Sequence, residues 1–141
     1  MSIPRIGVNA QVIELGGPRY GAIAVPPFSE VFDIGWYKYG AVPGNPGNAV
    51  LLGHVDTYNG PAVFYNLYQL RPGDRIYVTV AGRVRRFSVR WVKEVPKAHF
   101  PAATVFGRTH NKRLWLITCG GAFNYATRSY VDNIVVSARA G

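Results

Sequence analysis

The sequence predicts an all-β fold, a closed eight-stranded β-barrel with a few short helices in the connections. Sixteen glycines and ten prolines in 141 residues mark many turns, as expected for short strands joined by loops. Hydrophobic residues make up 48% of the chain and charged residues 16%, which argues against a disordered protein, a charged coiled coil or a collagen-like fibre. A sheet of short strands removes its exposed edges by closing on itself. One domain, residues 1–141, is expected, because domains usually have about 100 to 200 residues.

Eight segments have the apolar pattern of short strands. In chain order they are Arg5 to Val8, Gln11 to Leu15, Ala22 to Val25, Ala49 to His54, Asp74 to Val80, Arg83 to Val95, Arg113 to Thr118 and Val131 to Ser137. Alternation is clearest on both sides of Ala81-Gly82, which predicts a hairpin with one buried face. Pro61 to Leu70 and Pro101 to Phe106 begin with proline, which favours the first turn of a short helix.

The chain is strongly basic. Sixteen Lys and Arg against seven Asp and Glu give a formal net charge of +9, which predicts attraction to a polyanion such as nucleic acid, anionic lipid or an envelope polymer. No window contains the roughly 18 continuous apolar residues of a membrane span. The first five residues lack the features of a signal peptide, but this says little about the compartment.

Cys119 is the only cysteine, so an internal disulfide and a zinc site with paired Cys ligands are excluded. It follows an apolar strand and precedes Gly120-Gly121, where a flexible turn is expected. A side chain at such a strand end is held firmly yet remains approachable. Cys119 is therefore a candidate nucleophile, and the alternative is a small buried hydrophobe at the rim of the barrel.

A cysteine nucleophile reacts as the thiolate and needs a nearby proton acceptor. His54 is the preferred partner because it also ends an apolar run and is followed by the carboxylate of Asp56. His99 is flanked by apolar residues before Pro101, and His110 lies in a polar segment; both are more simply structural or solvated. A third group must stabilise the oxyanion of acyl transfer. Arg128, nine positions after Cys119, could fold back to do so.

These residues resemble the sortases, cysteine transpeptidases of bacterial surfaces, and most closely the class F sortases of actinobacteria. The likeness covers nearly the whole chain. It consists of Ile3 to Ala10, Gly35-Trp36-Tyr37, Gly53-His54-Val55-Asp56, Gly60 to Phe64, Arg71-Pro72-Gly73-Asp74, and Leu116-Ile117-Thr118-Cys119 followed by Gly120-Gly121-Ala122-Phe123.

The resemblance implies cleavage of a Leu-Pro-x-Thr-Gly sorting signal between Thr and Gly. Cys119 would attack the Thr carbonyl, His54 would protonate the leaving amine, and Arg128 would stabilise the oxyanion. Thr118 and Trp115 are expected to contact the substrate. The implied partners are surface proteins with a sorting signal and a peptidoglycan precursor whose amine, or water, resolves the thioacyl enzyme. The implied location is the outer face of the cell membrane, with an N-terminal tether lying outside this sequence.

One departure from the family pattern concerns the arginine. Class F sortases are expected to carry Tyr-Arg-Asp-Asn before the last strand, and this sequence has Val131 at the Arg position. The third role is therefore assigned to Arg128, with Arg108 and Arg113 as alternatives. The seven acidic residues are scattered, so neither a calcium site nor any other metal or cofactor is expected.

Two other hypotheses remain open. A small basic barrel with exposed aromatic residues and arginines on a strand, such as Arg83 to Arg90, is also typical of a module that binds nucleic acid or an envelope polyanion. Alternatively, the chain is a sortase-like domain whose catalysis has weakened because Val131 replaces the arginine.

Overall fold

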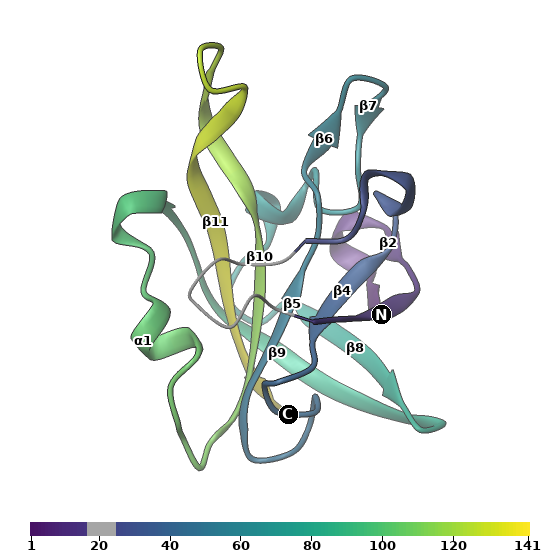
Figure 1. Ribbon diagram of the computed structural model, residues 1–141. Helices are drawn as coiled ribbons and strands as arrows, with labels where there is room; N and C mark the ends of the chain where they lie inside the picture. The colour runs from purple at the N-terminus through teal and green to yellow at the C-terminus, as the bar shows by residue number, and fades with distance from the viewer. Residues whose placement is uncertain (17–24) are drawn as a thin grey trace.

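The computed structural model describes residues 1–16 and 25–141. Within these ranges the chain forms one nine-stranded sheet with the order β2-β1-β8-β9-β11-β10-β5-β4-β3, and a separate hairpin, β6-β7 (Figure 1). The strands are β1 (Ser2–Ile3), β2 (Val8–Asn9), β3 (Val12–Leu15), β4 (Ile34–Tyr37), β5 (Gly47–Leu52), β6 (Asp56–Thr57), β7 (Gly60–Pro61), β8 (Arg75–Val80), β9 (Arg83–Pro96), β10 (Lys112–Asn124) and β11 (Ser129–Ala140). The all-β class is confirmed.

The sheet is curled but open, so the expected closed eight-stranded barrel is corrected to a nine-stranded half-barrel. Its two edge strands, β2 and β3, are separated by only Ala10 and Gln11 in the sequence. No ladder joins them in the described residues; β2 pairs only with β1, and β3 only with β4. The covalent chain therefore crosses the gap that hydrogen bonds would bridge in a closed barrel.

The sheet buries apolar side chains on both faces. Along β10, Leu114 and Leu116 belong to the larger cluster inside the curl, which includes Phe64, Ile76 and Phe87. Their neighbours Trp115 and Ile117 belong to a second cluster on the opposite face, together with Leu15, Val50, Leu52, Val105 and Val135. Because successive side chains of a strand point to opposite faces, β10 needs a nearly continuous apolar run.

The predicted hairpin is confirmed as β8 and β9, which pair antiparallel from Arg75 opposite Ser88 to Val80 opposite Arg83. The turn residues Ala81 and Gly82 have φ angles of 50° and 78°. Positive φ at both central residues is the geometry of a type I′ turn, whose twist matches that of the strands.

Other predicted elements differ in extent. Arg5 to Val8 is mainly the 3₁₀ turn Pro4–Ile6 instead of a strand, because Pro4 opens the turn and Gly7 ends it at a φ of 68°. Ala22 to Val25 lies largely outside the described residues, and β4 was not predicted. Gly120-Gly121 is not a turn, since β10 continues through it to Asn124.

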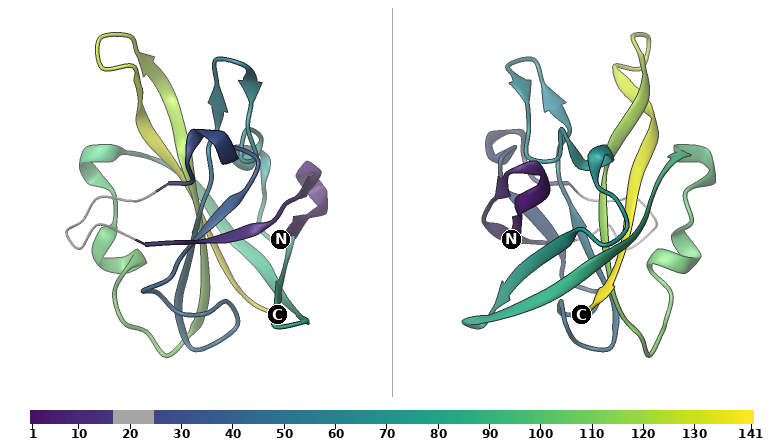
Figure 2. Two further views of the ribbon diagram at one scale, coloured as in Figure 1. Left: turned by 45° about the vertical axis from the view of Figure 1, so that its right-hand side comes forward. Right: turned by 180° about the vertical axis from the view of Figure 1, so that it is seen from behind.

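The helices are short, as expected. Pro101 to Phe106 contains α1 (Ala102–Val105), and Pro61 to Leu70 contains only the 3₁₀ turn Leu67–Gln69. Further 3₁₀ turns are Phe28–Glu30 and Lys97–His99. The segment around α1 packs outside the sheet, where Val105 joins the second cluster (Figures 1 and 2). No helix among the described residues has the length and apolarity required to cross a bilayer.

Candidate active site

The parallel pairing of β5 and β10 leads the chain toward His54 on one strand and toward Cys119 on the other. The register runs from Lys112 opposite Gly47 to Ile117 opposite Leu52. The N–H of Gly53 then donates to the carbonyl of Ile117 over 3.2 Å, which extends the ladder by one residue. His54 and Cys119 follow along the two segments, each two positions beyond the last registered pair, Leu52 and Ile117.

The position of Cys119 is set by β11 on its other side. Cys119 pairs with Asn133, whose amide donates to the carbonyl of Thr118 over 3.2 Å. The thiol is free and half-buried. Just beyond it, a bulge falls between Gly120 and Phe123. Gly121 has a φ of 72°, and a Cβ there would collide with the Asp132 carboxylate, so this backbone path requires glycine.

His54 is held by the tight packing of the preceding Gly53 and by a covering segment that contains Pro26 and Phe28. A Cβ on Gly53 would come within 2.7 Å of Phe64 and 2.8 Å of Val63, so glycine is needed where the chain leaves β5. The Nε2 of His54 lies 2.5 Å from the carbonyl oxygen of Pro26. Because a carbonyl only accepts, Nε2 carries a hydrogen here. The ring of Phe28 stacks on the imidazole, with 5.0 Å between centroids.

A hydrogen bond joins the segment after His54 to the last hairpin. The hydroxyl of Tyr130 donates to Oδ2 of Asp56 over 2.6 Å. This hydrogen bond, followed by burial and the negative charges of Asp56 and Cys119, raises the pKa of Tyr130 to about 12. Tyr130 therefore stays a neutral donor at physiological pH. In Figure 1 the β6-β7 and β10-β11 hairpins rise from the same end of the sheet, and this bond links them.

The comparisons with known proteins agree on one family. A model of the sortase domain matches residues 1–140. The chain belongs to the sortase family. Members of this family are cysteine transpeptidases that act at the cell surface on proteins with a sorting signal. No curated protein matches the chain.

Solved sortase structures share its fold. A lid mutant of sortase A from Corynebacterium diphtheriae is 22% identical with a TM-score of 0.74, and the match covers 99% of this chain and 67% of that one. Sortase C-1 from Actinomyces oris is 20% identical with a TM-score of 0.75, and the match covers 99% of this chain and 71% of that one. Sortase C1 from Streptococcus agalactiae is 17% identical with a TM-score of 0.75, and the match covers 99% of this chain and 65% of that one. The chain thus spans about two thirds of the length of these relatives.

The arginine predicted for the sortase site lies apart from Cys119 and His54. Arg128 is exposed, in the turn of the β10-β11 hairpin, with a φ of 52°. Five residues separate it from Asn133 along β11, roughly 16 Å at about 3.3 Å per residue. Val131 is 42% exposed, and alternation along β11 puts it on the same face as Asn133. Position 131, where class F sortases are expected to have arginine, thus faces the nucleophile's side.

The two alternative arginines also lie away from the thiol. Arg113 precedes Cys119 by six residues on β10, and its pKa is lowered by burial and by the nearby charges of Arg90 and Arg139. Arg108 lines a separate pocket near the start of β5. Neither residue is placed beside the thiol by the strand register.

Trp115 and Thr118, the expected substrate contacts, are buried at 3% and 4% exposure. The indole N–H of Trp115 donates to Asn48 over 2.9 Å. The hydroxyl of Thr118 has no hydrogen-bond partner in the described part of the chain. Both side chains are therefore buried, and neither presents a surface to a substrate in this structure.

Sequence reasoning did not find three residues that contact His54 or the nearby Asp56. Pro26 and Phe28 cover His54 although 28 and 26 positions separate them from it, and Tyr130 reaches Asp56 across 74 positions. In the sequence, only Asp56, two residues after His54, indicated that polar groups gather near the histidine. His99 and His110 are exposed and lie in other elements, the turn Lys97–His99 and the loop before β10.

Proposed function

We propose that the chain is a class F-like sortase that cleaves a Leu-Pro-x-Thr-Gly signal between Thr and Gly and transfers the acyl part to a cell-wall amine or to water. Its protein substrates are surface proteins that carry this signal, and its acceptor is the amine of a peptidoglycan precursor. It acts at the outer face of the membrane, where its basic charge of +9 favours the anionic envelope. No metal or cofactor takes part in this mechanism.

The observation that supports the proposal is the parallel pairing of β5 with β10, whose register ends at Leu52 and Ile117, two residues before His54 and Cys119. The ladder holds the two backbones firmly, and the adjoining glycines fit where Phe64, Ile134 and Asp132 leave no room for a Cβ. A nucleophile within one strand and a proton carrier just after the neighbouring strand form the basic arrangement for thioacyl chemistry.

In the first half-reaction the Cys119 thiolate attacks the Thr carbonyl carbon, and a C–S bond forms. The oxyanion collapses, the C–N bond to Gly breaks, and protonated His54 gives its proton to the departing amine. In the second half-reaction the acceptor amine attacks the thioester and gives a proton to His54. The C–S bond breaks and the thiolate returns. Before it can serve the leaving amine, the Nε2 hydrogen must leave the Pro26 carbonyl.

The oxyanion requires a donor, and Arg128 is the candidate put forward for it. If Arg128 folds over the site, Arg128→Ala lowers turnover by about 100-fold or more, the usual cost of an oxyanion donor. If it does not, Arg128→Ala keeps full turnover. In that second case, Val131→Arg places a guanidinium on the same face of β11 as Asn133 and raises turnover. This result would identify Val131 as the cause of weakened catalysis.

The test is cleavage of a Leu-Pro-x-Thr-Gly peptide, followed by mass spectrometry with and without an added amine. The wild type is compared with Cys119→Ala and His54→Ala, and with His99→Ala as a control for an exposed histidine. The proposal predicts a product ending in Thr, an amide product when amine is present, and loss of both only in the first two variants. Equal cleavage by Cys119→Ala contradicts it.

A further inference from the structure

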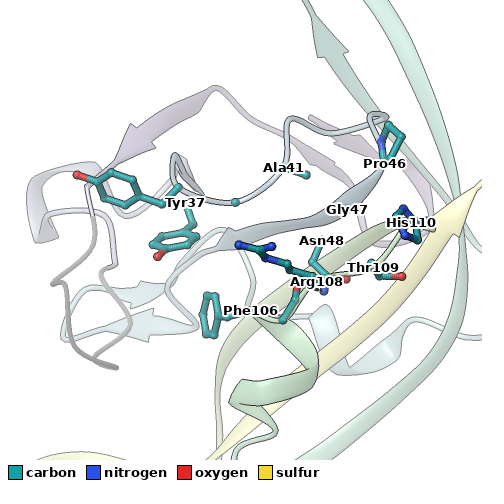
Figure 3. Close-up of a pocket in the computed structure, with 12 residues that line it drawn as sticks. Tyr37, Ala41, Pro46, Gly47, Asn48, Phe106, Arg108, Thr109 and His110 are labelled. Atoms are coloured by element: carbon teal, nitrogen blue, oxygen red, sulfur yellow. Dashed lines mark hydrogen bonds between the residues drawn. The ribbon is translucent and has the colours of Figure 1, made fainter.

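A second concave site lies at the opposite end of the β5-β10 ladder from Cys119. It has a volume of about 750 Å³ and is lined by the β4-β5 connection, the start of β5, and the loop before β10 (Figure 3). This volume lies within the range of about 300 to 1,000 Å³ that is usual for ligand pockets. Neither the catalytic pair nor its cover lines it.

The wall of this pocket is anchored by one buried side chain. The amide of Asn48, 8% exposed, donates to the carbonyls of Thr104 and Gly107 over 3.0 and 2.9 Å. Its oxygen accepts from the indole of Trp115 over 2.9 Å. All the principal bonding capacity of the amide is therefore used to hold the loop before β10 against β5.

The lining combines aromatic rings with positive charge. Tyr37 contacts Phe106 and Tyr39 edge to face, with 5.3 and 5.7 Å between centroids. Figure 3 shows Tyr37 and Phe106 at one end, His110 near the other end, and the guanidinium of Arg108 between them. None of the twelve lining residues is acidic. Such a lining suits a carboxylate, which Arg can bind through two parallel hydrogen bonds, beside an aromatic or apolar group.

The pocket and the catalytic pair share one face of the sheet. Asn48, Leu52 and His54 stand an even number of residues apart on β5 and its extension, so they point to the same side. Six residues separate Asn48 from His54, which corresponds to roughly 20 Å at about 3.3 Å per residue. An extended peptide covers this distance with about six residues. Because Leu52 and Ile117 are buried in the same cluster as Val105, such a peptide passes over the α1 segment and not along the sheet itself.

We propose that this pocket binds an acidic side chain, with an apolar or aromatic neighbour, carried by the polypeptide substrate about six residues N-terminal to the cleaved bond. The inference rests on the proposed function, because the spacing of six residues is counted from the bond that Cys119 cleaves. The N-terminal side is chosen because the acyl part of the substrate stays attached through both half-reactions, whereas the other part leaves after the first. Contacts to the retained part therefore serve both steps.

The binding arm of the test does not depend on catalysis. A six-residue peptide with two Asp and one Tyr, lacking the sorting motif, is titrated against the ¹⁵N-labelled protein, and its Lys counterpart serves as the control ligand. The acidic peptide is expected to shift the amides of Gly107, Arg108 and His110, with an affinity that falls as salt is added. Equal shifts with the Lys peptide, or no shift in this loop, overturn the proposal even if the protein is an active sortase.

The kinetic arm uses sorting-motif peptides with Asp or Lys placed six residues before the cleaved bond. The Asp peptide is expected to have a KM about three to ten times lower, as for one charge-assisted contact, with kcat unchanged. Arg108→Glu reverses the preference. Arg83→Glu, at the exposed β8-β9 turn outside the pocket, keeps it. Equal KM values for the two peptides in the wild type, or no change in Arg108→Glu, contradict the proposal.

Discussion

The hydrogen bond from Tyr130 to Asp56 offers a quantitative test of how the β6-β7 and β10-β11 hairpins are held together. Tyr130→Phe removes only the hydroxyl and keeps the ring, which packs on Phe123 with 5.1 Å between centroids. A bond of 2.6 Å to a carboxylate is worth about 1.5 to 3 kcal/mol when buried. Both groups are only half-buried, so solvent screening reduces the expected loss to about 1 kcal/mol. For 141 residues this lowers Tm by about 3 to 4 °C.

The assay is a double-mutant cycle with Asp56→Ala, measured by denaturant unfolding. The coupling free energy between positions 56 and 130 is expected to be about 1 kcal/mol. Tyr125→Phe is the matched control, because Tyr125 is 84% exposed on the same hairpin and has no carboxylate partner in the described residues. Additive effects of the two substitutions, or an equal loss in Tyr125→Phe, would refute the reasoning.

Further predictions concern the same neighbourhood. In wild type the unfolding free energy should fall as pH rises from 10 to about 12, because the folded pKa of Tyr130 lies above its unfolded value; in Tyr130→Phe this part of the fall should vanish from the pH titration. Gly53→Ala should cost about 1 to 3 kcal/mol and lower peptide cleavage, since its Cβ meets Phe64 at 2.7 Å, whereas Gly16→Ala, with nothing within 4 Å, should be neutral in both assays. Phe28→Ala removes a stacked ring from His54 and should raise kcat/KM about two- to fivefold, as loss of about 0.5 to 1 kcal/mol of cover predicts; an unchanged rate would show that this cover does not oppose catalysis.

Much of the fold follows from local pattern. The β8-β9 hairpin was predictable because alternation and the Ala81-Gly82 turn both act over a few residues. The open edge was not, because it depends on whether β2 and β3, which are close in sequence, form a ladder across the curl. The extension of β10 through Gly120-Gly121 was also missed, because pairing with β11 through a bulge outweighs the turn preference of glycine.

The candidate site shows the same division. His54 and Cys119 could be proposed from the sequence because each follows an apolar run beside glycine, and the observed register of β5 and β10 ends two residues before both of them. The cover from Pro26 and Phe28 could not be predicted, because it depends on a contact between segments without a shared pattern. The assignment of Arg128 rested on sequence distance alone, and a hairpin separates residues that a loop would have brought together.

The central claim is that Cys119 forms a thioacyl bond with the Thr of a sorting signal. Intact-protein mass spectrometry after mixing with a Leu-Pro-x-Thr-Gly peptide, quenched in acid, tests this claim most directly. The account predicts an added mass equal to the peptide up to Thr, on a fragment containing Cys119, that disappears when an amine is added and is absent in Cys119→Ala. Peptide cleavage without such an adduct at any quench time, and undiminished in Cys119→Ala, would contradict it.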